Sequence, residues 1–252
     1  MKNWFINHIW KLLGINRLLY YQNEQQKKLD EIAITNKEIL KAFMFNDSIK
    51  DCEWLKYKSF SAGEWAIDYG CLYTLFRVLN DIHPKSILEF GLGQSSKLIH
   101  QYADYYADAT AITYEHDENW IEFFCKGKTG DYKVNINKTE LQSIEYKGET
   151  TLSYKDNCEE LIGKKFDFIM IDAPFGSARY SRSQILNIVP ACLADSFCII
   201  MDDFNRKGEQ ETVAELQNIL QSNGIETIKA VYTASKDHCL ICSKDLKFLA
   251  SL

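Results

Sequence analysis

The sequence lacks the features of several classes of protein. It has no apolar run close to the roughly 20 residues that would span a bilayer, and no small-residue cleavage site follows its apolar start. Its net charge of −6 argues against broad binding to nucleic-acid backbones. It contains no internal repeat and no low-complexity segment. These absences favour a globular protein of the cytoplasm that has no nucleic-acid partner.

The eight cysteines do not form a recognisable metal or disulfide framework. Without an export signal, they are most simply reduced thiols. Cys239-Leu240-Ile241-Cys242 has the spacing of a zinc or redox pair, but it lies in an apolar strand and no second such pair exists. We therefore interpret these two cysteines as small buried hydrophobic residues.

The chain divides into an N-terminal helical extension, residues 1–45, and a main domain, residues 46–252. At 252 residues, 46% of them hydrophobic, it can form one α/β domain with a full core and an extension. Residues 1–20 contain three basic residues, no acid and many apolar ones. Such a helix suits peripheral contact with the inner face of a membrane, or packing on the domain or on a second subunit.

Residues 21–43 are strongly helical and have an apolar residue pattern with heptad spacing. Its members are Leu29, Ile32, Asn36, Ile39 and Phe43. Asn36 is the kind of polar residue that sets the register of a coiled coil. The pattern therefore predicts a homodimer through residues 1–45.

Strands and helices alternate through the main domain. A capping-box pattern at Ser61-Ala62-Gly63-Glu64 predicts a helix through about Leu79. The predicted strands are 86–91, 110–116, one within 132–146, 166–172, 196–201, 226–232 and 238–243. The predicted helices between them are 94–105, 118–126, 181–193 and 209–222.

This alternation predicts an α/β fold with a mostly parallel sheet of seven strands, covered on both faces. The last two strands are joined by only Thr233-Ala234-Ser235-Lys236, which forces them to be antiparallel. The predicted sheet therefore ends in a C-terminal antiparallel hairpin, unlike an all-parallel dinucleotide-binding sheet.

The run Glu89-Phe90-Gly91-Leu92-Gly93-Gln94-Ser95-Ser96 follows a buried strand and opens a helix. Glycines at such a turn let the backbone approach a nucleotide-like ligand, so Gly91, Gly93, Ser95 and Ser96 are candidate contacts. Glu115, with His116 beside it, ends the next strand, where a carboxylate can accept hydrogen bonds from ribose hydroxyls.

Glu89 indicates which ligand this is. A carboxylate next to the glycine turn would repel a pyrophosphate but would suit a ligand that carries an ammonium and a sulfonium group. S-adenosylmethionine is such a ligand, and the sequence therefore favours a methyltransferase.

Acidic residues follow two further strands. Asp172 ends the predicted strand Phe166–Asp172, and Asp202 and Asp203 follow the predicted strand Ser196–Met201. Ligands of open α/β sheets lie outside the carboxyl ends of the strands, so these acids should meet the glycine turn in one cleft. Asp172 is a candidate general base and cofactor contact, and Asp202 a candidate catalytic residue. Asp172, Asp202 and Asp203 also form an oxygen-only set suited to a divalent ion such as Mg²⁺. The alternative is that they cap turns or pair with arginines.

The loop after Asp172 supplies candidate substrate contacts. Arg179, Tyr180 and Arg182 could bind an anionic acceptor, because guanidinium groups bind carboxylates bidentately. Equally, they could be ordinary surface residues. Asp156 precedes the fourth strand and is a candidate cofactor contact or a simple turn residue.

Residues 59–243 resemble class I S-adenosylmethionine-dependent methyltransferases, and within them the polysaccharide O-methyltransferases related to glucuronoxylan 4-O-methyltransferase. The matching segments are Glu89–Ser96, Asp172-Ala173-Pro174-Phe175-Gly176 and Met201-Asp202-Asp203-Phe204-Asn205-Arg206. The resemblance implies the Rossmann-like methyltransferase fold, cofactor contacts at Glu89, Gly91, Gly93, Ser95 and Glu115, and Asp172 as the base. The chain departs from the pattern at residues 177–180 and in having Asp202 where a histidine is usual.

The sequence thus predicts O-methylation of a carbohydrate or surface-polysaccharide precursor. Three alternatives stay open: a metal-dependent methyltransferase with a small-molecule acceptor, a nicotinamide-dependent oxidoreductase, and a non-catalytic module tethered to a membrane or partner.

Overall fold

The computed structural model describes residues 11, 14–63, 66–128, 130–155, 161 and 163–252. Its centre is a seven-stranded sheet in the order β3-β2-β1-β6-β7-β9-β8, in which only β9 runs antiparallel to its neighbours. The predicted fold class is therefore confirmed.

The helices are α2 (Ile15–Ser48), α3 (Tyr69–Ile82), α4 (Gln94–Tyr105), α5 (Glu118–Gly127), α7 (Gln184–Ile188), α8 (Lys207–Ser222) and the 3-10 helix η1 (Lys244–Ser251). The strands are β1 (Ser86–Phe90), β2 (Thr110–Glu115), β3 (Ile136–Lys138), β4 (Leu141–Tyr146), β5 (Glu149–Tyr154), β6 (Phe166–Ile171), β7 (Leu193–Met201), β8 (Thr227–Thr233) and β9 (Asp237–Ser243).

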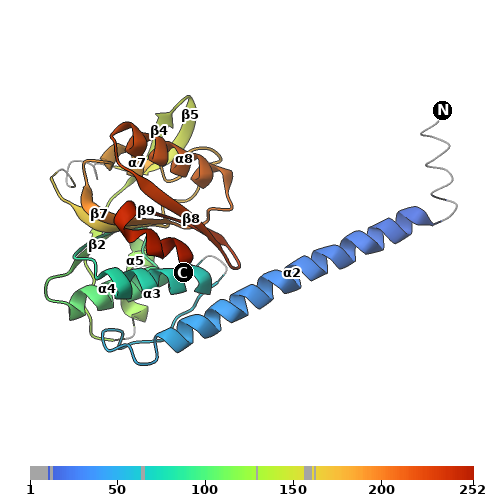
Figure 1. The fold of residues 1–252 in the computed structure, drawn as a ribbon, viewed down its shortest axis with the longest axis horizontal. Coiled ribbons are helices and arrows are strands. Elements are labelled where there is room, and N and C mark those ends of the chain that lie inside the picture. Colours follow the sequence, from blue (N-terminus) through green and yellow to red (C-terminus); the bar gives the residue numbers. More distant parts are fainter. Residues whose placement is uncertain (1–10, 12–13, 64–65, 129, 156–160, 162) are drawn as a thin grey trace.

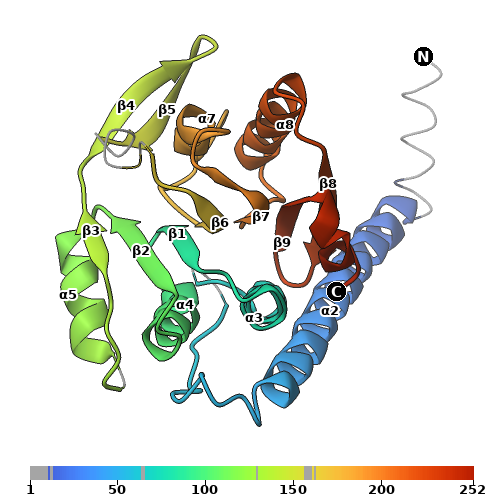
Figure 2. The ribbon, with the colours of Figure 1, turned by 60° about the vertical axis from the view of Figure 1, so that its left-hand side comes forward.

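Helices cover both faces of the sheet (Figure 2), with α3 and α4 on one face and α7 and α8 on the other. The strands of the centre are apolar on both sides, as buried parallel strands must be. Ile87 of β1 packs on the α3 side, whereas Leu88 and Phe90 pack on the α7 side. This alternation also decides where the polar residue between them, Glu89, points.

Three predicted boundaries are wrong, each for a local reason. Helix α3 begins at Tyr69 because Asp68 accepts a hydrogen bond from the Cys71 amide at 2.8 Å, and Glu64 lies outside the described residues. Helix α7 spans only Gln184–Ile188, because Arg182 has a positive φ before it and Pro190 follows it. Residues 132–146 hold two strands, and the second pairs with β5.

The β4–β5 hairpin forms a separate two-stranded sheet that stands beside α8 (Figure 1). Its turn is Lys147-Gly148, and both residues have positive φ, as a tight hairpin turn requires. Gly148 takes this conformation without strain, so a lysine–glycine pair between two alternating runs was the signal that sequence analysis missed.

Helix α2 stands out from the body along most of its length (Figure 1). Its last turns belong to the core, where Phe45 is fully buried against Phe60, Tyr69 and Phe76. The predicted domain boundary at residue 45 therefore falls inside a continuous helix. Of the helices in the described part of the chain, none has the length and hydropathy that crossing a bilayer would need.

The described cysteines are all free thiols. Cys239 and Cys242 lie on β9 and pack in the cores on opposite faces of the sheet. Two side chains that point in opposite directions cannot share a metal ion, so their interpretation as buried hydrophobic residues is confirmed.

Candidate active site

The predicted convergence of strand ends is present at the carboxyl edge of β2, β1, β6 and β7. The Leu92 amide donates to Glu115 Oε2 at 3.0 Å, which joins the loop after β1 to the end of β2. The Asp172 amide donates to the Phe90 carbonyl at 2.8 Å, and the Asp202 amide to the Ile171 carbonyl at 3.0 Å. The glycine turn and the acidic residues therefore lie side by side at one edge of the sheet.

The two glycines of the turn have different roles. Gly91 has a φ of +103°, and a Cβ there would lie 2.8 Å from the Ala173 Cβ, so only glycine lets the loops after β1 and β6 touch. Gly93 is extended, and a Cβ there would meet nothing within 4 Å. The backbone at Gly93 therefore borders open space, as a ligand cradle must.

Glu89 does not face this open edge. Its side chain lies under the first turn of α4, fully buried, and accepts hydrogen bonds from Ser95 at 2.6 Å and Ser96 at 2.7 Å. A third hydroxyl, that of Thr113 on β2, donates at 2.6 Å. The expected direct contacts of Glu89, Ser95 and Ser96 with a ligand do not fit this geometry, because strand alternation turns Glu89 into the interior. These residues instead hold the glycine turn in place.

Burial raises the pKa of Glu89 from 4.5 to about 7, although its three hydroxyl partners favour the charged form. Between these two values the folded chain keeps a proton that the unfolded chain has released, so stability falls as the pH rises from 4.5 to 7. A pKa shift of this size changes the free energy of unfolding by about 3 kcal/mol.

We expect the Glu89→Gln variant to lose this share of the pH dependence. Denaturant unfolding at pH 5 and pH 8 measures it, as the difference between the two free energies of unfolding. That difference should be about 3 kcal/mol smaller in the variant than in the wild type. Equal differences in the two proteins would show that Glu89 has an ordinary pKa.

Glu115 is 4% exposed and already holds backbone groups. Its Oε1 accepts from the amides of His116 at 2.7 Å and Asp117 at 3.0 Å, and its Oε2 from Leu92. A carboxylate has about four acceptor positions, so Oε2 keeps one for a ligand hydroxyl. The His116 Nδ1 lies 2.8 Å from Glu115 Oε1. Of the other predicted cofactor contacts, Asp156 lies outside the described residues.

Sequence analysis missed Trp120. Its indole N–H donates to the Leu92 carbonyl at 2.7 Å, and its ring stacks on Phe123 with centroids 5.3 Å apart. Trp120 thus fixes the glycine turn from the side of α5. The only sequence signal was its place in the first turn of the helix that follows Glu115.

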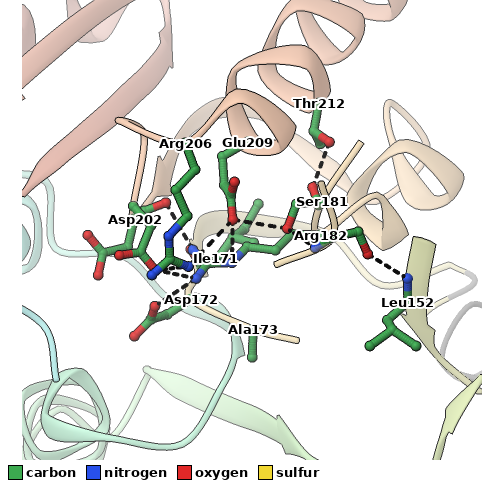
Figure 3. Close-up of polar contacts among 12 residues, drawn as sticks. Leu152, Ile171, Asp172, Ala173, Ser181, Arg182, Asp202, Arg206, Glu209 and Thr212 are labelled. Atoms are coloured by element: carbon green, nitrogen blue, oxygen red, sulfur yellow. Dashed lines mark hydrogen bonds and ion pairs between the residues drawn. The ribbon is translucent and has the colours of Figure 1, made fainter. Parts of the chain in front are cut away.

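The predicted acidic cluster is present. Asp172, Asp202 and Asp203 each bring a carboxylate oxygen within 4.8 Å of the others. The guanidinium of Arg182 lies among them, 2.7 Å from Asp203 and 3.3 Å from Asp172, and also donates to the carbonyls of Ile171 and Asp202 (Figure 3). Glu209, on α8, completes the surroundings, with Oε1 3.7 Å from Arg182 Nε. The cluster therefore carries its own internal cation.

The three aspartates differ in proton affinity. Burial raises the pKa of Asp172 to about 6, against the opposing effect of Arg182. Burial and the neighbouring carboxylates raise the pKa of Asp202 well above its ordinary value. Although burial opposes it, Arg182, Lys236 and Arg206 together lower the pKa of Asp203. Asp203 is thus the permanent anion, and Asp172 is poised to exchange a proton near neutral pH.

Asp202 is the unusual member. It is 1% exposed, and neither of its carboxylate oxygens accepts a hydrogen bond from any residue that the structure describes. Two non-glycine residues of the cluster, Arg182 and Asp203, have a positive φ. Unpartnered buried acids and strained backbone are costly, and they persist mainly where function requires them.

The arginines predicted to bind an acceptor are engaged within the chain. Arg182 is 2% exposed and cannot reach an outside ligand. Arg179 binds Glu211 at 2.6 Å and Glu149 at 2.8 Å, which fastens the β4–β5 hairpin to α8. The Tyr180 ring packs on Tyr146 of the same hairpin, with centroids 5.1 Å apart. Both arginines therefore pair with carboxylates of this chain, whereas the sequence predicted that they would bind a carboxylate of the acceptor.

A divalent ion would fit only part of the cluster. Both oxygens of Asp202 are available, and the Asp172 side chain is 23% exposed at the strand edge. Both oxygens of Asp203, however, already face cations: Oδ2 contacts Arg182 and Arg206, and Oδ1 lies 3.5 Å from Lys236. Asp172 and Asp202 would therefore be the protein ligands of such an ion.

No family model matches the sequence, and no curated protein matches it. Among solved structures, the fold is similar to a methyltransferase of Podospora anserina bound to SAH, at 15% identity over 88% of this chain and 97% of that one, with a TM-score of 0.49. An O-methyltransferase of Bacillus cereus in complex with SAH matches at 15% identity over 68% of this chain and 79% of that one, with a TM-score of 0.46. Similarity at this level of identity and superposition carries no argument about what this chain binds or transforms.

Proposed function

We propose that the chain is an S-adenosylmethionine-dependent methyltransferase that transfers a methyl group to an oxygen atom of its acceptor. The observation that carries this proposal is the contact between the loops after β1 and β6. A Cβ at Gly91 would lie 2.8 Å from the Ala173 Cβ and 3.3 Å from the Asp172 carbonyl carbon, so the loop that carries Gly93 touches the loop that carries Asp172, whose pKa burial raises to about 6. A nucleoside cradle next to a proton acceptor is what methyl transfer to a hydroxyl requires.

Each residue of the site has a separate role in the proposed reaction. Gly93 leaves room for the cofactor, and the remaining acceptor position of Glu115 would hold a ribose hydroxyl. S-adenosylmethionine, when bound, supplies a methyl group whose bond to sulfur breaks as the acceptor oxygen attacks. Asp172 would accept the proton of that oxygen. Arg182 holds Asp172 in position through its 3.3 Å contact.

The acceptor is proposed to be a hydroxyl of a carbohydrate or of a surface-polysaccharide precursor in the cytoplasm. The support is the resemblance of the segments after β6 and β7 to polysaccharide O-methyltransferases. The second candidate is a small hydroxylated molecule held by a divalent ion. It is favoured by the two unpartnered oxygens of Asp202, because a metal-bound hydroxyl loses its proton more readily.

A nicotinamide-dependent oxidoreductase is less well supported. Glu89 no longer argues against it, since its carboxylate is buried under α4. The antiparallel β9 at the end of the sheet does argue against it, because dinucleotide-binding sheets are usually all parallel.

Cofactor binding can be tested at Gly93. We expect calorimetry to show binding of S-adenosylhomocysteine and no binding of NAD. The Gly93→Leu variant should fold normally, because a Cβ at this position meets nothing within 4 Å, but its affinity should fall at least tenfold as the longer side chain fills the cradle. Gly127→Leu, at an equally open position at the end of α5, is the matched control. NAD binding, or unchanged affinity in Gly93→Leu, would contradict the proposal.

A further inference from the structure

Helix α2 presents an apolar stripe that its own domain does not cover. The stripe consists of Leu29, Ile32, Asn36, Ile39 and Phe43, and it projects from a helix that stands away from the body (Figure 1). Phe43 is 71% exposed and Leu29 is 59% exposed. Apolar surface in one continuous line marks an interaction site rather than scattered exposure.

The stripe is separate from the face that anchors α2. Phe45, fully buried, and Met44, partly buried, pack against the core, and Phe45 lies about 200° around the helix from Phe43. The Glu38 carboxylate also accepts from the Tyr69 amide at 2.8 Å, which fixes α2 to the start of α3. The stripe therefore lies on the side of α2 that faces away from its anchoring contacts.

The spacing fits a second copy of the same helix. Leu29, Asn36 and Phe43 occupy one heptad position, and Ile32 and Ile39 occupy the other. In a parallel, in-register pair, Asn36 would face its counterpart, and the two amides could hydrogen-bond to each other. An asparagine at this position is the usual device that fixes register and strand number.

Charge does not oppose the pairing. Residues 15–48 contain five basic and five acidic residues. In the parallel arrangement, Lys28 would flank Ala33 of the second copy and Thr35 would flank Leu40, so no like charges meet. Leu40, which is 59% exposed, would widen the buried seam. A membrane surface would instead be favoured by an excess of basic residues.

The stripe extends over residues 29–43, about 21 Å of helix, and a helix about 10 Å wide presents on the order of 200 Å² in projection over that length. Each partner of a specific interface contributes roughly 800 Å², so the stripe would form the apolar centre of a larger contact that also includes the preceding part of α2, residues 15–28.

We propose that the α2 stripe pairs with the α2 stripe of a second copy in a parallel coiled coil, which makes the protein a homodimer. The pairing does not use Glu38, which holds α2 to the start of α3 and to the β8–β9 turn. The paired α2 helices would then connect the two active sites of the dimer.

Sedimentation equilibrium of the full chain tests the proposal. We expect twice the monomer mass for the wild type. Ile32→Asp, in the stripe, should raise the dimer dissociation constant on the order of 100-fold, because a charge would be buried at the seam. Ile34→Asp changes the same residue type two positions away, outside the stripe and at 44% exposure, and should leave the dimer unchanged.

Orientation is tested by cysteine substitution. Asn36→Cys should form a covalent dimer on mild oxidation, whereas Lys37→Cys, one residue outside the stripe, should not exceed the wild-type background. A monomeric wild type, equal effects of the two aspartate variants, or cross-linking at Lys37→Cys alone would overturn the proposal. So would a monomer that sediments with anionic phospholipid vesicles and loses this binding in Ile32→Asp.

Discussion

The Asp172→Asn variant should lose turnover by a factor on the order of 10²–10⁴, the contribution of a positioned general base. Asparagine keeps the shape of the side chain and can still accept from Arg182, whose guanidinium lies 3.3 Å away. It cannot accept the acceptor's proton. The affinity for S-adenosylhomocysteine, measured by calorimetry, should therefore stay within a few-fold of the wild type.

The pH profile gives a second measure of the same role. Asp172 acts as a base only when it is deprotonated, and burial raises its pKa to about 6. The wild-type rate should therefore rise with pH below about 6 and level off above it. Asp104→Asn, at an exposed position at the end of α4, is the control and should match the wild type. Full activity in Asp172→Asn would remove Asp172 from the mechanism.

The second large effect is expected at Arg182. Its guanidinium is 2% exposed and lies 2.7 Å from Asp203, which is itself buried. Replacing it with methionine fills the volume but removes the buried cation that faces Asp172, Asp203 and Glu209, so that Asp203 keeps only its contacts with Arg206 and Lys236. Removing one partner of a buried ion pair costs about 3–5 kcal/mol, so we expect Arg182→Met to lower the free energy of denaturant unfolding by that amount.

Two further variants keep this prediction testable where Arg182→Met does not fold. Arg182→Lys retains the charge but not the planar fork, so its loss should be intermediate. In the double variant Arg182→Met/Asp203→Asn, both members of the ion pair are gone, so the double loss should be smaller than the sum of the two single losses. Additive losses, or a free energy of unfolding within 0.5 kcal/mol of the wild type in Arg182→Met, would show that the cluster does not depend on this cation.

The elements that sequence analysis located correctly are those governed by local rules. Apolar runs bounded by polar strand ends predicted β1, β2, β6 and β9, and apolar periodicity predicted α4 almost to the residue. Sequence analysis failed where the backbone adopts an uncommon conformation. The positive φ of Arg182 shortened α7, and the Lys147-Gly148 turn produced a hairpin where one strand was expected.

The site shows the same division. The strand ends that carry Asp172, Asp202 and Glu115 could be predicted, because parallel strands bring their carboxyl ends to one edge. The contacts that each side chain makes could not be predicted. Glu89 was expected to meet a ligand and instead accepts three hydroxyls in the interior. Arg182 and Arg179 were expected at an acceptor and instead bind carboxylates that come from distant parts of the sequence.

The sequence alone determined the order of strands and helices, the antiparallel hairpin and the residues at the carboxyl edge, since propensity, periodicity and turn length act over short stretches of chain. Only the tertiary structure decided which carboxylate is satisfied and which is left without a partner. Glu89 differs from Asp202 in its neighbours, which are hydroxyls on α4 and β2 in one case and further acids in the other. Proton affinity and ligand access depend on burial and on charges brought together from separate strands, and these exist only once the sheet has formed.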